Sequence, residues 1–319
     1  MPGTKPRVTL VAACYNHARF LRDCLSSIAA QTVDAYDLIV VDDASTDGSQ
    51  DLIRATIQEL RLDARIIFHT SNRGICATFN AALAEVRTPF VAFLSTDDVL
   101  MPTRLEHQVD LLDALGPDVA FVYSDMPVID GAGERTGDHF YGPSMPNRYR
   151  TGREEMYREL LGGNFIAAPS AMMRTEALRA VGGYDERLVY EDYDVWCKLT
   201  REYRVGFDDQ ETVLYRRDGA EGDHASLSDE LQSARRATYL LTNVRILAKH
   251  LGQSHELDQL ITGRAYSYAM EAYKLGARDK ELYQAFFARL RVSPSLRGVV
   301  LTLLAVLRVP IQKFLPSLR

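Results

Sequence analysis

The sequence of 319 residues is poor in cysteine, and the cysteines that it has are widely spaced. Cys14, Cys24, Cys76 and Cys197 form no CxxC pair and have no histidine at ligand spacing, which argues against a zinc site and favours free thiols in a reducing compartment. The N-terminus lacks a signal-peptide pattern, and no charge-free apolar run approaches the roughly 18 residues of a membrane span. We therefore expect a cytoplasmic protein.

Positive charge is also in short supply. The net charge of −6 argues against nucleic acid as a partner. The basic residues are unevenly placed, however, because the chain from Leu282 onward has no acidic residue but does contain Arg289, Arg291, Arg297, Arg308, Lys313 and Arg319. Otherwise the composition, with 46% hydrophobic and 25% charged residues, predicts a globular core that needs no disulfide or structural metal.

The first half of the chain alternates short apolar runs with amphipathic stretches. The runs at residues 8–13, 37–42, 64–69, 89–95 and 119–124 are typical of strands buried on both faces. Between them, apolar side chains recur at helical spacing in residues 20–28, 52–60 and 105–115. This alternation predicts an α/β fold with a mostly parallel, Rossmann-like sheet flanked by helices, in which ligands bind beyond the carboxyl ends of the strands.

The second half is less regular. Residues 127–152 are rich in Gly, Pro, Asn and Asp, which predicts a long loop that contributes to a site or links two halves. We then expect helices at 154–161 and 191–202, and strands at 164–168, 170–174, 203–207 and 212–217. From about residue 228 the pattern is all-helical, with helices expected at 235–249, 255–275, 280–290 and 296–309.

Polar residues follow three of the predicted strands. The first strand leads into Tyr15 and Asn16, the second ends in Asp42 and Asp43, and the fourth is followed by Asp97 and Asp98. Turn and cap chemistry explains residues 47–49, but paired carboxylates at the end of a buried strand favour a ligand or a metal, since burying an unpartnered charge is costly. Asp97 and Asp98 suit Mg²⁺ or Mn²⁺, and the alternative for Asp98 is a helix cap near Pro102.

A second acidic cluster, at residues 191–194, opens the helix that carries Trp196. Carboxylates in the first turn of a helix are stabilised by the helix dipole, so a purely structural origin for this cluster stays open beside a catalytic one. Trp196 itself is more typical of a core residue.

The series of segments resembles glycosyltransferase family 2, inverting enzymes of GT-A fold: VTLVAACYN, DLIVVDDASTDGS, NRGICATFN, FVAFLSTDD, GGYDE and YEDYDVW. Each motif is weak alone, but six in order are specific. The match runs from about Val8 to Arg217. The resemblance implies a GT-A catalytic domain over residues 1–226, with a nucleotide-binding half (1–125) and an acceptor half (126–226), followed by an all-helical C-terminal region over 227–319.

The resemblance also assigns roles to residues. Nucleotide-sugar binding falls to Ala13, Tyr15, Asp43, Arg73, Gly74 and Asp97. Tyr15 would flank the base, and Asp43 would accept a base N–H, commonly N3–H of uracil. Asp97 and Asp98 would hold Mg²⁺ or Mn²⁺, although the family's usual first carboxylate is Ser95 here. Asp192, with Glu191 beside it, would be the catalytic base. The diphosphate candidates are Arg216, Arg217 and His224.

The implied reaction is transfer of a sugar, with inversion, from a UDP- or dTDP-sugar to a hydroxyl of a saccharide or lipid-linked saccharide, in the synthesis of cell-surface polysaccharide. The departures at Ser95 and at Thr78-Phe79-Asn80, where the family often has Ala-Arg-Asn, leave open a non-catalytic nucleotide-sugar-binding or scaffold protein. A sugar-nucleotidyltransferase is disfavoured because no Gly-rich phosphate loop follows the first strand.

The basic C-terminal region includes ten uncharged residues, 298–307, between Arg297 and Arg308. Ten residues cannot span a bilayer. Two interpretations stay open: this helix docks on the inner face of an anionic membrane, or it packs on the rest of the chain or on a second subunit of a homo-oligomer.

Overall fold

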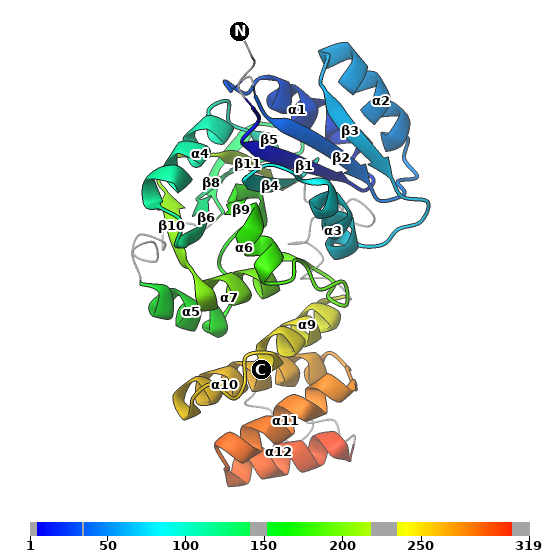
Figure 1. Cartoon of the computed structure of the whole chain (residues 1–319). Coiled ribbons are helices and arrows are strands. Elements are labelled where there is room, and N and C mark those ends of the chain that lie inside the picture. Colours follow the sequence, from blue (N-terminus) through cyan, green and yellow to red (C-terminus); the bar gives the residue numbers. More distant parts are fainter. Residues whose placement is uncertain (1–4, 34, 141–151, 218–234, 308–319) are drawn as a thin grey trace. The chain divides into compact units, whose positions relative to one another are not determined.

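The computed structural model describes residues 5–33, 35–140, 152–217 and 235–307 (Figure 1). The chain divides into two compact units. Unit 1 comprises residues 1–157 and 165–226, and unit 2 comprises residues 158–164 and 227–319. The short segment 158–164, which includes the end of α5 (Arg153–Gly162), therefore belongs with the C-terminal helices.

Unit 1 is built on a sheet that, within the described residues, has seven strands in the order β10-β6-β9-β4-β1-β2-β3. Its strands are β1 (Val8–Cys14), β2 (Asp37–Asp42), β3 (Ala64–Phe68), β4 (Phe90–Ser95), β6 (Val119–Ser124), β9 (Met172–Arg174) and β10 (Arg204–Asp208). All neighbours are parallel except β9, which runs antiparallel to both β4 and β6. The predicted α/β fold with a mostly parallel sheet is confirmed.

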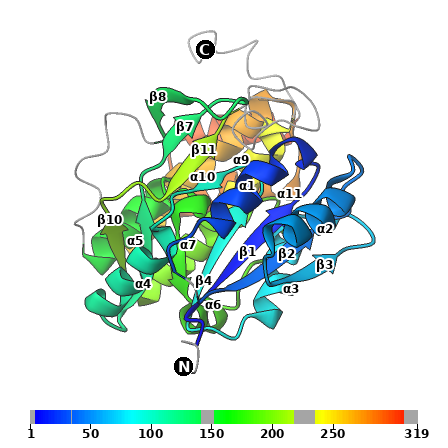
Figure 2. The same cartoon turned by 90° about the horizontal axis from the view of Figure 1, so that it is seen from above.

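Helices cover both faces of this sheet (Figures 1 and 2). One face packs its even-numbered β1 side chains against α1 (Ala18–Ala29), α2 (Ser49–Leu60) and α4 (Arg104–Leu115) in a continuous apolar core. The other face carries α3 (Ile75–Glu85), α6 (Thr175–Ala180) and α7 (Asp192–Glu202). On that face Trp196 stacks on Phe121 at 4.6 Å between ring centroids, which confirms Trp196 as a core residue.

A second, smaller sheet contains β5 (Val99–Leu100), β11 (Val213–Arg216), β7 (Pro127–Ile129) and β8 (Arg135–His139), in that order. The β7–β8 hairpin corrects the prediction of a continuous loop over residues 127–152, of which 141–151 lie outside the described residues. The predicted strand at 164–168 is also wrong, because residues 163–167 have no regular structure and η3 (Ala168–Ser170) follows them.

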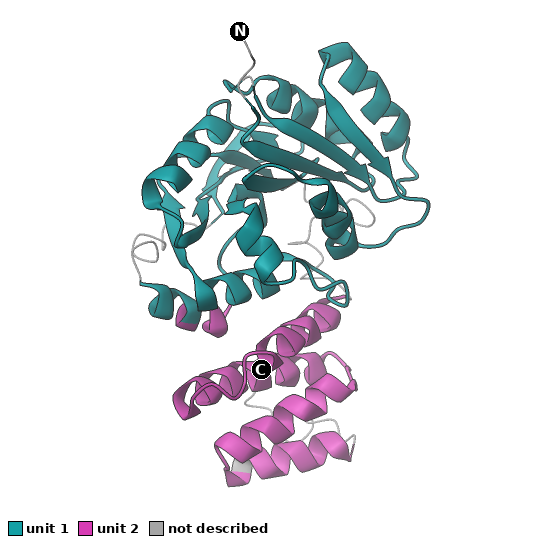
Figure 3. Ribbon diagram, in the orientation of Figure 1, with its two compact units in different colours: residues 1–157, 165–226 teal, residues 158–164, 227–319 magenta. Residues whose placement is uncertain are grey.

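The regular secondary structure of unit 2 is entirely helical within its described residues (Figure 3). Its main helices are α9 (Arg236–Ala248), α10 (His255–Lys274), α11 (Lys280–Val292) and α12 (Leu296–Val306). They agree closely with the predicted bounds. Among the described residues, no helix combines the length and the hydrophobicity needed to cross a membrane.

Candidate active site

The polar residues that follow β1, β2 and β4 meet at one edge of the main sheet. These strands are parallel neighbours, so their carboxyl ends lie side by side. The ladder continues past the strands, since the Asp43 N–H donates to the Cys14 carbonyl at 2.9 Å and the Thr96 N–H donates to the Ala13 carbonyl at 3.0 Å. Ala13 is one of the residues predicted to bind the nucleotide-sugar, and its carbonyl already accepts this hydrogen bond from Thr96.

Tyr15 is presented on a turn that is cross-linked to the loop after β2. Asn16 adopts a positive φ of 56°, which is uncommon outside glycine and needs local support. Its N–H donates to Ser45 Oγ at 2.9 Å, and its Oδ1 accepts the Thr46 N–H at 2.9 Å. Tyr15 itself stays 44% exposed. An aromatic ring fixed at its backbone and open to solvent is suited to stacking on a flat ligand.

The two successive aspartates at the end of β2 have different surroundings. Asp42 is fully buried and accepts hydrogen bonds from the Ser45 N–H, the Ser45 hydroxyl and the Gln50 side chain. Asp42 therefore fixes the loop between β2 and α2, and the protein alone explains its charge.

Asp43 is buried at the same edge, and three donors hold its carboxylate. Oδ1 accepts from His69 Nδ1 at 2.9 Å and from the Arg73 N–H at 2.8 Å, while Oδ2 accepts from the Gly74 N–H at 2.8 Å. Gly74 has a positive φ of 82°, which favours glycine and turns its N–H toward Asp43. Arg73 and Gly74 thus contact Asp43 through their backbone. His69 was missed by the sequence reasoning, although a polar residue ending the strand beside Asp43 is a usable signal.

Asp97 and Asp98 differ in burial and in partners. Asp98 is almost fully buried, its Oδ1 accepts the Arg216 N–H at 2.9 Å, and burial together with the nearby Asp97 charge raises its pKa well above the usual value. Asp97 Oδ1 is buried and has no hydrogen-bond partner among the described residues. His17 Nδ1 lies 3.9 Å from that oxygen. The helix cap considered for Asp98 is wrong, because α4 begins after Thr103.

Asp97 and Asp98 have the chemistry of a site for a divalent cation. Two adjacent carboxylates, one with an unpartnered buried oxygen and the other with a raised pKa, gain from a cation that offsets their charges. Among the described residues no group of three or more His, Cys, Asp or Glu is arranged as a metal site. The donor set therefore fits an ion such as Mg²⁺ that takes its remaining ligands from phosphates and water.

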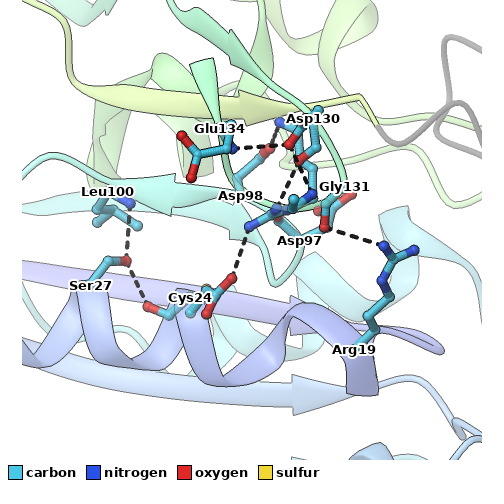
Figure 4. Close-up of polar contacts among 12 residues, drawn as sticks. Arg19, Cys24, Ser27, Asp97, Asp98, Leu100, Asp130, Gly131 and Glu134 are labelled. Carbon is cyan, nitrogen blue, oxygen red and sulfur yellow. Dashed lines mark hydrogen bonds and ion pairs between the residues drawn. The ribbon is translucent and has the colours of Figure 1, made fainter. Parts of the chain in front are cut away.

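Arg216, a diphosphate candidate, is built into the fold beneath Asp97 and Asp98. Its buried guanidinium donates to three acceptors: the Asp97 carbonyl at 2.7 Å, the Asp130 carbonyl at 2.9 Å and the Asp23 carboxylate at 3.2 Å. Figure 4 shows Asp97 and Asp98 beside Asp130 and Gly131 of the β7–β8 turn. Arg216 thus joins α1, β4, β7 and β11. Because its guanidinium nitrogens already donate to these acceptors, Arg216 is poorly suited to binding a diphosphate.

The other two diphosphate candidates differ from Arg216. Arg217 is exposed, and its guanidinium lies 5.6 Å from the ring centroid of Tyr215 and 5.8 Å from that of Phe140. His224 lies outside the described residues.

The acidic pair Glu191-Asp192 stands at the start of α7, with Glu191 as the residue preceding its first turn. Burial, and next the charge of Asp192, raises the pKa of Glu191 to about 8. Asp194, in the first turn of the helix, is fully buried and pairs with Lys198 at 2.7 Å. The raised pKa favours the protonated form of Glu191 at neutral pH, and Asp192 lies near the positive end of the helix dipole.

Helix α3 connects the two acidic regions. Gly74, which bonds to Asp43, precedes its first residue. Two residues later the buried Cys76 Sγ lies 3.6 Å from the Leu188 carbonyl, and burial, followed by the charge of Glu191, raises the pKa of its thiol. Asp43 and the Glu191-Asp192 pair thus lie at the same end of one helix.

The segment Thr78-Phe79-Asn80 shows what replaces the expected cation. Phe79 is buried, with its ring centroid 4.5 Å from that of Phe93 and 5.3 Å from that of Tyr184. Asn80 donates to the Tyr184 carbonyl at 2.8 Å and accepts the Tyr184 N–H at 3.0 Å. These residues tie α3 to the segment before α7 and supply no positive charge.

Comparison with known proteins places the chain in a family. The family model described as "Glycosyl transferase family 2" matches residues 9–182. An uncharacterised glycosyltransferase of Rickettsia typhi is 26% identical over 224 residues, 70% of this chain and 68% of the relative. An O-antigen biosynthesis protein, RfbC of Myxococcus xanthus, is 26% identical over 308 residues, which are 96% of this chain but only 22% of RfbC.

Solved structures share the fold. S. aureus TarS 1–349 in complex with UDP has a TM-score of 0.62 at 16% identity, covering 95% of this chain and 87% of the other. The mannosyltransferase PcManGT from Pyrobaculum calidifontis, in complex with GDP-Man and Mn²⁺, has a TM-score of 0.58 at 19% identity, covering 96% and 81%. The predicted GT-A fold with C-terminal helices is confirmed.

Proposed function

The chain belongs to glycosyl transferase family 2 and is a glycosyltransferase; from this premise we propose that it moves a sugar, with inversion, from a UDP- or dTDP-sugar to a hydroxyl of a saccharide or lipid-linked saccharide. The observation that carries this proposal is the grouping of Tyr15, Asp43 and Asp97 at one sheet edge, with Glu191 and Asp192 near the same end of α3 as Asp43. A role in cell-surface polysaccharide synthesis is supported by the likeness to RfbC.

The preference for a pyrimidine base rests on the occupancy of Asp43. Oδ1 already accepts two donors and Oδ2 accepts one, so Oδ2 has room for one more. Uracil and thymine offer a single N3–H, whereas the guanine edge offers two adjacent donors that a carboxylate binds best with both oxygens. Tyr15 would stack on the base from its exposed position.

Asp97 and Asp98 would hold a divalent cation, Mg²⁺ or Mn²⁺. When bound, the cation supplies charge neutralisation at the departing nucleoside diphosphate. The buried, unpartnered Oδ1 of Asp97 and the raised pKa of Asp98 support this role, although Ser95 contributes no carboxylate. Arg217, rather than Arg216, is the residue of this pair that we propose to face the diphosphate, since its guanidinium is exposed. His224 stays a candidate from the sequence.

Asp192 is the proposed base that takes the proton from the acceptor hydroxyl as the hydroxyl oxygen attacks the anomeric carbon. The raised pKa of Glu191 supports this assignment, because a neighbour that already holds a proton is not available as the base. In this proposal Glu191 stays protonated, and Asp192 accepts the proton of the acceptor hydroxyl.

The experiment is a thermal-shift screen of nucleotide-sugars with Mn²⁺, followed by measurement of released nucleoside diphosphate with saccharide acceptors. We expect UDP- or dTDP-sugars to raise the melting temperature more than GDP-mannose does, and product release to accompany acceptor addition. A larger rise in melting temperature with GDP-mannose would overturn the proposed preference for uracil or thymine as the nucleobase. Donor binding without release in the presence of any acceptor would overturn the proposed transfer.

A further inference from the structure

Helix α12 exposes a continuous apolar stripe. Its large apolar side chains on one side are 40–82% exposed and recur every three or four residues: Leu296, Val299, Val300, Leu303, Val306 and Leu307, the last directly after the helix. The opposite side is buried in unit 2 through Leu301, Thr302 and Ala305. Soluble proteins seldom leave a stripe of this size uncovered, so a partner surface is indicated.

The neighbouring helix α11 adds basic residues around a further apolar group. Lys280, Gln284, Phe287 and Arg291 are spaced to share one helix face, and all four are exposed. The single carboxylate of α11, Glu281, is buried and pairs with Arg245 at 3.2 Å. Helix α12 has none. The exposed side chains of α11 and α12, here called the hairpin surface, are therefore apolar, neutral or basic within the described residues.

The composition of the hairpin surface favours a lipid partner over a second copy of the chain. A second copy of the chain meeting the same surface would bring Lys280 and Arg291 against their equivalents, which like-charge repulsion disfavours. Eleven helical residues extend about 16 Å, roughly half of a bilayer's hydrocarbon core, so α12 can lie in a membrane interface but not span it. Within α11 and α12 an apolar stripe lies beside exposed basic residues and no exposed acidic one, although the exposed Asp279 directly precedes α11. Such a composition fits the anionic headgroups and acyl boundary of a lipid surface.

We propose that the hairpin surface docks on an anionic lipid bilayer, with the α12 stripe in the headgroup–acyl boundary and with Lys280 and Arg291 at the lipid phosphates. The sequence after α12 continues the basic character, because residues 308–319 include three basic residues and no acidic one. This proposal is independent of the proposed sugar transfer, since none of its residues belongs to the candidate active site.

The test is co-sedimentation of the full chain with vesicles of phosphatidylcholine, with and without 30 mol% phosphatidylglycerol as a roughly physiological anionic fraction. We expect pelleting with the anionic vesicles, and about tenfold weaker binding for Val299→Glu/Leu303→Glu and for Lys280→Glu/Arg291→Glu. Added salt should weaken binding of the wild type. Leu275→Glu is the matched control, since Leu275 is 52% exposed, close to the 54% of Leu303, but lies at the end of α10. It should bind as the wild type does.

Three results would overturn the proposal. The first is failure of the wild type to pellet with anionic vesicles. The second is equal pelleting of wild type and both surface variants. The third is a wild-type dimer in sedimentation equilibrium that Val299→Glu/Leu303→Glu converts to a monomer, which would assign the surface to self-association. Leu303→Ser, checked by thermal melting, replaces the double variant if that variant does not fold.

Discussion

The two acidic regions of unit 1, at Asp43 and at Glu191-Asp192, place their carboxylates in opposite environments. Asp43 is held by three donors from His69, Arg73 and Gly74, so the direction of its carboxylate is fixed before any ligand arrives. At the start of α7, burial and a neighbouring charge raise the pKa of Glu191 to about 8. A carboxylate fixed by donors suits binding, and a pair that shares one charge suits proton transfer. The following predictions test this division.

The largest effect is expected at the proposed base. Asp192→Asn should lower the transfer rate by about a thousandfold or more, because an amide accepts no proton at neutral pH. Steady-state release of nucleoside diphosphate measures the effect. Glu202→Gln is the matched control, since Glu202 ends the same helix in an exposed position and pairs with Arg201. Turnover of Asp192→Asn close to that of the wild type would move the base elsewhere.

Removal of Asp97 should act on binding through the cation. We expect Asp97→Ala to lose most of the Mn²⁺-dependent part of donor affinity, about tenfold or more, because it deletes the oxygen that has no protein partner. Calorimetry with and without Mn²⁺ measures the difference. Should the wild type bind the donor equally well in both conditions, the metal assignment is wrong.

Asp43→Ala should weaken donor binding about tenfold, by removing one acceptor for the base and the anchor of the Arg73-Gly74 turn. The effect should fall on KM and leave kcat within about threefold. If kcat falls while KM is unchanged, Asp43 belongs to the chemistry and the division between the two regions fails.

His69 should contribute by orienting Asp43, as a positioning residue. His69→Ala should raise the donor KM about threefold to fivefold, and His69→Asn should recover most of that loss because its amide can donate where Nδ1 does. Equal KM values for the two variants would mean that the hydrogen bond to Asp43 is not what His69 supplies.

The last prediction concerns the pH dependence of stability and involves Glu191. Its folded pKa of about 8 exceeds that of an unfolded glutamate, so the folded state retains a proton that the unfolded state loses, and stability falls as pH rises between about 4.5 and 8. Glu191→Gln should remove this fall, gaining about 4 kcal/mol at most over the wild type between pH 5 and pH 8.5. Urea unfolding at the two pH values measures the gain, and a constant difference would contradict the assignment.

The sequence predicts the parts of the fold that depend on local pattern. β1, β2 and β4 are continuous apolar runs, and the polar residues that follow them mark the edge of the sheet. The β7–β8 hairpin could not be predicted in this way, because every residue of β8 is exposed and the pairing itself creates the strand. Residues 164–168 are the converse case: Ile166 and Ala167 are buried, as a strand would require, but the Ile166 carbonyl accepts the Trp196 indole N–H at 3.2 Å, and residues 163–167 have no regular structure.

In the candidate site, too, the sequence reveals the residues that depend on local pattern but not their partners from distant segments. Its carboxylates stand out in the sequence because charge after a buried strand needs an explanation. The partners of those carboxylates do not stand out, since they come from distant segments. Asp42 and Asp43 are adjacent in sequence, yet one closes a loop and the other faces His69 from β3's end. Arg216 likewise matches the family pattern, but its three acceptors lie on separate elements.

The most direct test of the division is the donor affinity of Asp192→Asn, measured by calorimetry with Mn²⁺ on the preparation whose transfer rate has been determined. The account predicts a dissociation constant within about twofold of the wild type alongside a transfer rate reduced about a thousandfold. A loss of affinity that matches the loss of rate, in a variant that melts like the wild type, would contradict it.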